Sequence, residues 1–477
     1  MIIPNHIRKL TLANEIANES YDVFSPNDHN FIASVELPNS NQIEKAISEV
    51  TTNFKRFSDS DIYLISKILS KVAKKIKKNA DYLAYLIASE GGKPLKDAKV
   101  EVQRAESTLR ECAMECFNLK GEIIEMNKSP RGKNKNAYTK LFPIGPVLAI
   151  SAFNHPLNLI CHQVGTAIAA RCTIILKPAP NTALCSFELY NYFMEAGLDY
   201  GIFHILPLDG ESTSKIVSDK RFKYVNFIGS EKVGWNIWKN VYPGTKVQFE
   251  HGGVGTAVVL NDANIDKAIP SLITSSFYHS GQVCVSTQNI YLEKGIYSKF
   301  KEKFIECAKL LKVGDARDIN TDCGPIIKKE SCDRIEIWVD EAMENGANAI
   351  TGGHRISDNY YSVTILENVK RGMKVYEDEI FGPVVNFIGF DNLENVIEEI
   401  NSSEFAFQTC IFTSNLSKAL NYAHSIDQKA CMVNEHNAFR VDWMPFGGYK
   451  KSGYGVSGVK YAIHDLQVEK LIILNNI

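Results

Sequence analysis

Apolar and polar residues alternate with two different periods along the chain, and the two periods predict different elements. Over residues 41–57 and 61–95, apolar positions recur every three or four residues, a spacing that predicts two amphipathic helices. The second helix is expected to end near Gly91, Gly92 and Pro94, because these residues break helices.

Between residues 147 and 230, short apolar runs alternate with helical patterns. The runs predict strands at 147–153, 172–180, 201–207 and 224–230, and helices are expected at about 156–170, 182–196 and 211–218. This alternation is typical of βαβ units, so it predicts a mostly parallel sheet.

A second α/β pattern covers residues 253–435, and two further segments complete the prediction. Helices are expected near 296–312 and 329–346, and strands at 288–293 and 409–413. Residues 121–142 predict two strands around a turn rich in Pro, Gly and Asn, a protruding hairpin that is a candidate subunit contact. Residues 468–477 predict a final strand.

Composition and charge exclude several classes of protein. The 477 residues are 45% hydrophobic and 23% charged, which is typical of a globular protein with about two or three packed units. The 53 basic and 55 acidic residues nearly cancel, so no overall field attracts nucleic acid or an anionic membrane. The start MIIPNHIRKLTLANE lacks the apolar stretch of a signal peptide, and no apolar run reaches the length of about 18 residues that spans a membrane. We therefore expect a cytoplasmic protein without nucleic-acid or membrane partners.

Two patterns that resemble binding motifs lack the required context. The 11 cysteines show neither a dense disulfide pattern nor paired zinc spacing, and the nearest pair, Cys112 and Cys116, is one helical turn apart. We expect reduced thiols and no metal site. The GxGxxG match at Gly453, Gly455 and Gly458 does not lie between a strand and a helix, so we reject it as a dinucleotide motif.

A better candidate for a phosphate site lies in YVNFIGSEKVG, where a predicted strand ends at Gly229. Ser230 is placed to cap the following helix, whose free N–H groups and dipole can hold a pyrophosphate, and Gly234 would permit close approach. An ordinary helix cap explains the same residues. Lys177, at the end of another predicted strand, lies where ligands of parallel sheets bind, although a solvated lysine is the alternative.

Three other stretches carry groups of complementary chemistry. Asn154 in FNHP offers an amide, Glu250 in FEHGG a carboxylate, and Cys284 in SGQVC a thiol. A thiol nucleophile, an amide that stabilises an oxyanion and a carboxylate that activates water are what covalent oxidation of a carbonyl requires. Taken alone, Cys284 would be read as a buried and inert thiol.

Together these stretches resemble the NAD(P)-dependent aldehyde dehydrogenase superfamily over almost the whole chain. The shared motifs are EGGKPLKDAKVEV, PIGPVLAISAFNHPLN, LKP, FIGSEKVG, FEHGG, SGQVC, LKVGD, TDCGP, EDEIFGPVV and MPFGGYKKSGYG, all in family order. The resemblance implies that Cys284 attacks the aldehyde, that the Asn154 amide and the Cys284 N–H stabilise the oxyanion, and that Glu250 activates the water that releases the acid. A non-catalytic scaffold is the remote alternative, but it would have no need of all three groups.

The resemblance also implies NAD or NADP as the cofactor. The residues expected to bind it are Lys177 at the adenosine ribose, Gly229, Ser230 and Gly234 at the pyrophosphate, and Phe153, Glu379 and Phe381 at the nicotinamide end. Members that prefer NAD usually carry a glutamate where this chain has Pro180. Such a carboxylate repels the 2′-phosphate of NADP, so its absence leaves both cofactors open.

Three basic residues are expected at the substrate. Positions that line the aldehyde tunnel in relatives are here Arg104, His162 and Arg440, which suit a short polar aldehyde better than a fatty or aromatic one. The chain looks most like the lactaldehyde dehydrogenase branch, so lactaldehyde or glycolaldehyde is the leading substrate type. A short anionic aldehyde such as phosphonoacetaldehyde, sulfoacetaldehyde or a semialdehyde is the alternative. Arg104 could instead be a surface helix residue, and Arg440 could pair with Asp442.

The fold class follows from the alternation and the resemblance together. We expect an α/β protein with a doubly wound, Rossmann-type nucleotide-binding domain over residues 1–122 and 143–252 and a catalytic α/β domain over residues 253–435. Residues 123–142 and 459–477 would form an oligomerisation arm and its closing strand. In the family this arm contacts a neighbouring subunit, which implies a homodimer or homotetramer.

Overall fold

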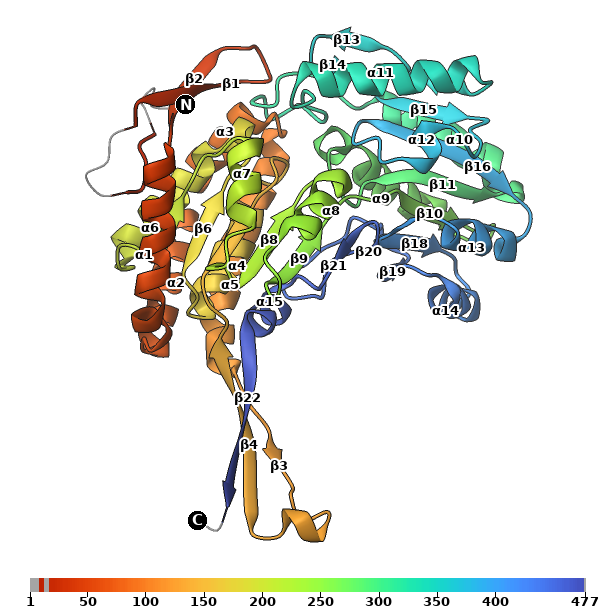
Figure 1. Ribbon diagram of the computed structural model, residues 1–477. Helices are drawn as coiled ribbons and strands as arrows, with labels where there is room; N and C mark the ends of the chain where they lie inside the picture. Colours follow the sequence, from red (N-terminus) through yellow and green to blue (C-terminus); the bar gives the residue numbers. More distant parts are fainter. Residues whose placement is uncertain (1–7, 13–16, 476–477) are drawn as a thin grey trace.

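The computed structural model describes residues 8–12 and 17–475, and it contains two large sheets flanked by helices (Figure 1). The first sheet has the strand order β21-β9-β8-β5-β6-β7 and is parallel except for β21. Its strands are β5 (Val147–Ile150), β6 (Ile174–Lys177), β7 (Phe203–Ile205), β8 (Tyr224–Ile228), β9 (Lys246–Glu250) and β21 (Gly453–Tyr454). The helices that alternate with them are α5 (Asn158–Ala169), α6 (Leu184–Ala196), α7 (Gly210–Val217) and α8 (Glu231–Asn240). The predicted parallel sheet is confirmed.

The second sheet has the order β12-β15-β16-β11-β10-β18-β19, and only its β12–β15 pair is antiparallel. Its strands are β10 (Gly255–Val259), β11 (Thr287–Glu293), β12 (Asn348–Thr351), β15 (Thr364–Glu367), β16 (Val384–Phe390), β18 (Gln408–Phe412) and β19 (Ala430–Val433). Its helices are α9 (Ile265–Phe277), α10 (Lys294–Lys309), α11 (Lys329–Glu344), α12 (Lys374–Glu377), α13 (Leu393–Asn401) and α14 (Leu416–Ser425). The two sheets meet where β9 leads into β10, and Glu250 is the last residue of β9.

The N-terminal part adds a hairpin and four helices. The hairpin pairs β1 (Glu19–Phe24) with β2 (Phe31–Leu37), and the helices are α1 (Ser40–Ser58), α2 (Ile62–Lys78), α3 (Ala80–Gly91) and α4 (Leu95–Glu115). The prediction of one helix over residues 61–95 is wrong, because the helix is interrupted at Asn79. There the backbone has φ -104° and ψ 23°, and the side-chain amide donates to the Lys75 carbonyl at 2.9 Å. Asparagine competes in this way with helical hydrogen bonds, and the hydrophobic period continues on both sides of the break.

An arm of three strands extends away from the two sheets (Figure 1). It consists of β3 (Ile123–Ile124), β4 (Lys135–Pro143) and β22 (Gln467–Asn475), and β22 follows the short helix α15 (Val459–Asp465). β22 runs antiparallel to β4 from Gln467 opposite Pro143 to Asn475 opposite Lys135. The predicted hairpin and final strand are confirmed, although residues 476 and 477 lie outside the described residues, as does most of the MIIPNHIRKLTLANE start. The division into domains at the predicted boundaries stays a prediction.

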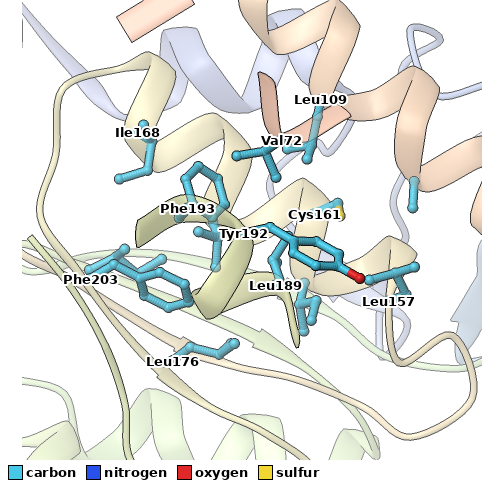
Figure 2. Packing of buried hydrophobic residues seen from close by; sticks show 14 of the residues in the cluster. Val72, Leu109, Leu157, Cys161, Ile168, Leu176, Leu189, Tyr192, Phe193 and Phe203 are labelled. Atoms are coloured by element: carbon cyan, nitrogen blue, oxygen red, sulfur yellow. The ribbon is translucent and has the colours of Figure 1, made fainter. Parts of the chain in front are cut away.

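The largest core packs α4, α5 and α6 against the first sheet. Figure 2 shows Leu109 of α4, Leu157 and Cys161 at the start of α5, and Phe193 of α6 in one cluster. Every residue of α5 is buried, which explains why its apolar residues show no clear helical stripe. A buried helix of this kind holds its position with little freedom, so residues at its start are fixed in space.

A buried glutamate satisfies the hydrogen-bond donors at the N-terminus of α6 in this core. Glu90, on α3, accepts hydrogen bonds from the peptide N–H groups of Leu184 (2.9 Å) and Cys185 (3.1 Å) at the start of α6. Neither α6 nor its N-cap Ala183 supplies a side chain that caps this end. Burial raises the pKa of Glu90 to about 7, against these hydrogen bonds, which lower it.

Replacement of Glu90 by glutamine should make stability less dependent on pH. The folded-state pKa lies above the ordinary 4.5, so this group's contribution to stability is full below that value and is lost as the pH rises through about 7. We expect the melting temperature of the wild type to fall, relative to that of Glu90→Gln, by roughly 5 °C between pH 5 and pH 8. Differential scanning calorimetry at both pH values measures this, and a difference that does not change with pH would contradict it.

Candidate active site

Cys284 follows a strained turn at the end of α9. His279, Ser280 and Gly281 have φ values of 49°, 55° and 72°, the left-handed region that non-glycine residues rarely adopt. The Ser280 hydroxyl donates to the Gly324 carbonyl at 2.7 Å, and a Cβ on Gly281 would overlap the Gly382 carbonyl. The surrounding chain therefore holds the turn in a conformation that directs the segment with Cys284 towards β9.

The thiol and the carboxylate predicted from sequence lie side by side. Cys284 Sγ lies 3.7 Å from Glu250 Oε1, and the Ser457 hydroxyl lies 3.4 Å from Glu250 Oε2. Burial raises the pKa of Glu250 above its ordinary range. Burial, and then the charge of Glu250, raises the pKa of Cys284 well above the usual value for a thiol. The resting pair therefore disfavours two negative charges, so the thiol and the carboxylate are not both ionised at rest.

The amide predicted from sequence reaches the same loop. Asn154 lies between β5 and α5 and is 4% exposed, and its Nδ2 donates to the Gln282 carbonyl at 3.0 Å. The Gln282 side chain accepts from the Ile327 N–H (2.9 Å) and donates to the Pro325 carbonyl (3.2 Å), which anchors the loop in turn. Asn154, Glu250 and Cys284, far apart in sequence, are thus brought together at the junction of the two sheets.

A buried carboxylate, Asp442, organises the predicted substrate residues. Its Oδ1 accepts from Arg104 Nη2 (2.8 Å), His162 Nε2 (2.8 Å) and Asn158 Nδ2 (3.1 Å). Burial alone would raise the pKa of Asp442, but the hydrogen bond from His162 and the charge and hydrogen bond of Arg104 hold it well below its ordinary range. Burial lowers the pKa of His162, which leaves a neutral imidazole near pH 7.

Two alternatives considered for the basic residues are therefore wrong. Arg104 is not a surface helix residue, because its guanidinium pairs with buried Asp442 and its side chain is only 22% exposed. Arg440 does not pair with Asp442. Among residues 8–12 and 17–475 it forms no ion pair, and its guanidinium stacks on the Phe446 ring at 3.6 Å from the centroid. Arg440 is thus the arginine of the two that has no ion-pair partner among the described residues, and burial lowers its pKa against the charges of Glu250 and Asp442.

Several site residues were not anticipated from sequence. Asp442, Asn158 and Thr108 belong to the network, since the Thr108 hydroxyl donates to Asn158 Oδ1 at 3.0 Å. A signal was present: Glu101, Arg104 and Thr108 are polar residues at helical spacing on one face of α4, and the buried positions of that helix share this face. Asp442 carried no signal, because its partners lie more than 250 residues away.

The residues of the predicted phosphate site lie at the start of α8. Ser230 takes the N-cap position of α8 with extended backbone, but its hydroxyl makes no capping hydrogen bond and is exposed. Gly229 precedes it. A Cβ on Gly234 would overlap Nε2 of His251, and the expected role of Gly234 at the pyrophosphate stays a prediction. The glycine admits the imidazole that follows Glu250 in the chain.

The remaining residues expected to bind the cofactor are Lys177, Phe153, Phe381 and Glu379. Lys177 is the last residue of β6, and burial lowers its pKa to about 8 against the opposing charge of Asp209. Phe153 and Phe381 meet edge to face with ring centroids 5.8 Å apart. Burial raises the pKa of Glu379 to about 8, and its carboxylate accepts a hydrogen bond from the Gly253 N–H at 3.3 Å. Together they provide a half-buried lysine, a free hydroxyl at a helix start and an aromatic pair, which fit a dinucleotide.

The glycine motif near the C-terminus has a different role. Gly453 pairs with Glu250 in the antiparallel contact between β21 and β9, and a Cβ on Gly453 would overlap the Phe249 carbonyl. The motif supports the strand of Glu250.

Comparison with known proteins decides the family. The model of the aldehyde dehydrogenase family matches residues 13–472. The chain belongs to the aldehyde dehydrogenase family. It is therefore an NAD(P)-dependent oxidoreductase, which uses NAD or NADP. Aldehyde dehydrogenases act on small aldehydes and are typically oligomeric.

Individual relatives span nearly the whole chain. A 3-sulfolactaldehyde dehydrogenase of Priestia aryabhattai is 35% identical over 97% of this chain and 96% of its own. A lactaldehyde dehydrogenase of Methanocaldococcus jannaschii is 34% identical over 96% and 98%. The crystal structure of the glyceraldehyde-3-phosphate dehydrogenase GapN from Methanocaldococcus jannaschii, complexed with NADP, matches with a TM-score of 0.92 and 34% identity over 96% of this chain and 100% of that one.

Within residues 8–12 and 17–475, no helix has the length and apolar character needed to cross a membrane. The same part of the chain contains no group of three or more His, Cys, Asp or Glu residues placed to hold a metal ion.

Proposed function

We propose that this aldehyde dehydrogenase oxidises a short polar aldehyde, of the lactaldehyde or glycolaldehyde type, to its carboxylic acid. The observation that carries the proposal is the convergence of Cys284, Glu250 and Asn154 beside a cluster of polar groups around Asp442. An aliphatic or aromatic substrate would leave the buried His162 Nδ1, which has no hydrogen-bond partner among the described residues, without one, which is costly.

The residues of the chain supply the covalent chemistry. The thiol of Cys284 loses its proton to solvent, and Sγ adds to the carbonyl carbon while the carbonyl electrons move to oxygen. The Asn154 amide and the Cys284 N–H stabilise that oxyanion. NAD or NADP, when bound, supplies the acceptor for the hydride that leaves the same carbon. Glu250 then removes a proton from water, which attacks the thioester and releases the acid and the thiol.

The cofactor would be held at both ends. Lys177 would bind the adenosine ribose, and the exposed hydroxyl of Ser230, with the backbone at Gly229, would bind the pyrophosphate at the start of α8. Glu379, Phe381 and Phe153 would hold the nicotinamide and its ribose. Pro180 is exposed and brings no carboxylate against a 2′-phosphate, in keeping with the NADP complex of the GapN relative.

A hydroxyl next to the aldehyde is the substrate feature that the site suits best. Lactaldehyde and sulfolactaldehyde, named for two relatives, both carry a hydroxyl on the carbon beside the carbonyl. Neutral His162 and the Arg104–Asp442 pair provide fixed donors and acceptors of moderate charge for such a group.

A short anionic aldehyde is the second candidate, and Arg440 is the observation that favours it. Its guanidinium has no ion-pair partner among the described residues and lies within electrostatic range of Glu250 and Cys284. Sulfolactaldehyde and glyceraldehyde-3-phosphate both carry an anionic group at the far end from the aldehyde.

The test is a comparison of kcat/KM for L-lactaldehyde, propanal and phosphonoacetaldehyde, measured by formation of reduced cofactor. A preference for L-lactaldehyde over both others supports the first candidate. A preference for phosphonoacetaldehyde would assign the protein to the second, with Arg440 as the anion partner. A preference for propanal would exclude a polar substrate altogether.

Replacement of His162 by phenylalanine should separate polar from apolar substrates. The variant loses the hydrogen bond of 2.8 Å to Asp442 and introduces an apolar ring, so we expect KM for L-lactaldehyde to rise about tenfold, the equivalent of one buried hydrogen bond. KM for propanal should change less than about threefold, because propanal has no hydroxyl to lose. Equal changes in KM for both aldehydes would show that His162 does not contact the substrate.

We also propose that the arm pairs with a second copy of the chain to form a dimer or tetramer. Its two outer strands, β3 and β22, are sheet edges, and Ile123, Leu471 and Ile473 on them are exposed apolar residues. Such edges are usually covered by a partner.

A further inference from the structure

Glu101, on α4, is a buried carboxylate whose two oxygens serve different partners. Oε1 accepts hydrogen bonds from the peptide N–H groups of Leu157 (2.9 Å) and Asn158 (3.1 Å), and Oε2 is paired with the ammonium of Lys93. Both side chains of the pair are out of solvent, at 0% and 1% exposure. The mechanism proposed above uses neither residue.

The start of α5 depends on this carboxylate. Leu157 occupies the N-cap position and has no side chain that can accept a hydrogen bond, so the first N–H groups of the helix would be orphaned without Glu101. A negative charge at a helix N-terminus is also favourable because it faces the positive end of the helix dipole. Glu101 therefore replaces the cap that the local sequence LNLI does not provide.

The segment that Glu101 anchors is the one that carries Asn154. Only His155 and Pro156 separate Asn154 from Leu157, which is fully buried in the cluster of Figure 2. At the other end of the segment, the Ser151 N–H donates to the Lys177 carbonyl at 3.0 Å. The Asn154 amide, which reaches the Gln282 carbonyl, thus extends from a short loop fixed at both ends.

We propose that Glu101, held in place by Lys93, is a positioning residue that fixes the Asn154 amide for stabilisation of the oxyanion. The inference rests on the proposed function, in which Asn154 donates to the oxyanion. Oxyanion donors act through preorganisation, and a displacement of a fraction of an ångström weakens them strongly. Loss of the acceptor at Glu101 frees the start of α5, and the amide then samples positions that do not face the developing charge.

A matched pair of variants isolates the acceptor from the charges. The double variant Lys93→Met with Glu101→Leu removes both charges and the acceptor, whereas Lys93→Met with Glu101→Gln removes both charges but keeps a side-chain oxygen for the two N–H groups. Neither leaves one member of the Lys93–Glu101 pair as a buried charge without the other. The readout is the rate of reduced-cofactor formation in the first turnover with L-lactaldehyde, together with KM.

We expect the leucine pair to lower the first-turnover rate at least tenfold with KM changed less than threefold, and the glutamine pair to recover the rate to within threefold of the wild type. In an Asn154→Ala background the two pairs should have equal rates, because a residue that acts through Asn154 has nothing left to position. Equal rates of the two pairs in the native background would overturn the proposal, and so would a difference that persists with Asn154→Ala.

Control variants distinguish this role from general support of a helix. Glu90 caps α6 through the same pattern of two N–H groups, at 2.9 Å and 3.1 Å, and α6 carries none of the residues assigned to the site. Glu90→Leu and Glu90→Gln should therefore differ in melting temperature and not in first-turnover rate. A rate loss for Glu90→Leu equal to that of the leucine pair would overturn the specific role of Glu101.

Failure of the leucine pair to fold and wild-type activity of Asn154→Ala are the two remaining outcomes. If the leucine pair does not fold, Lys93→Met with Glu101→Asn carries the same test, because its shorter side chain withdraws the acceptor and should lower the rate likewise. Wild-type activity of Asn154→Ala alone would overturn the oxyanion role in the proposed function, which is distinct from the failure of Glu101 to act through it.

Discussion

Replacement of Cys284 by alanine is expected to abolish aldehyde oxidation, with kcat lowered about ten-thousandfold or more. The variant has no atom that can form the bond to the carbonyl carbon, so neither hydride transfer nor thioester formation can begin. Cofactor binding should persist, because the predicted cofactor residues lie on other segments, at β6, at the start of α8 and in the loop before β16. Steady-state formation of reduced cofactor measures the loss, and fluorescence titration with NADPH measures binding.

Two other cysteines supply matched controls. Of the 11 cysteines, only Cys284, Cys307 and Cys431 are partly exposed. Cys307→Ala and Cys431→Ala remove a thiol of similar burial without touching Glu250, so each should keep at least half of the wild-type activity. If Cys284→Ala retained more than a hundredth of that activity, or if either control lost as much, Cys284 would not be the nucleophile.

Replacement of Glu250 by glutamine should leave the rate of the first turnover unchanged and prevent the second turnover. The amide cannot take a proton from water, so the thioester should accumulate and steady-state kcat should fall by about a hundredfold to ten-thousandfold. A burst of reduced cofactor equal to the enzyme concentration, followed by a slow rate, is the expected time course. The absence of a burst would mean that Glu250 is required before hydride transfer, as the acceptor of the thiol proton.

The pH dependence gives an independent check on Glu250. Burial raises the pKa of this carboxylate, so wild-type kcat should rise with pH as the carboxylate forms, with a midpoint above the ordinary range of a glutamate. In Glu250→Gln this rise should disappear. Glu293 is the matched control, since it too is the last residue of a strand, β11, and accepts from the Asn261 N–H. Glu293→Gln should keep both the turnover and its pH dependence.

Secondary structure was predictable wherever one periodicity governed a segment. The strands of both sheets and most helices follow from short apolar runs and from three- and four-residue spacing, because sheets buried on both faces require continuous apolar strands. The break at Asn79 escaped this reasoning, since the apolar period continues across it and the helix is interrupted at the backbone of a single residue, with φ -104° and ψ 23°.

The candidate site was predictable in its reacting groups and much less so in their support. Cys284, Glu250 and Asn154 could be named because each belongs to a short motif with recognisable chemistry. The partners of Arg104 and His162 could not, because Asp442 meets them only after α4, α5 and the C-terminal loops have packed together. The contact of Gly234 with His251 could not be predicted either, because the two residues are close in space and not in sequence.

The sequence by itself determined the alternation of strands and helices, the arm and the three groups that can carry covalent oxidation of an aldehyde. These depend on local period, turn residues and the identity of single side chains. The tertiary structure alone decided which charges remain free. Arg104 forms an ion pair with Asp442, Arg440 forms none among the described residues, and Glu101 caps a helix that its own segment does not contain. Pairing of buried charges and capping of helix ends depend on distances across the fold, and the order of residues along the chain does not encode those distances directly.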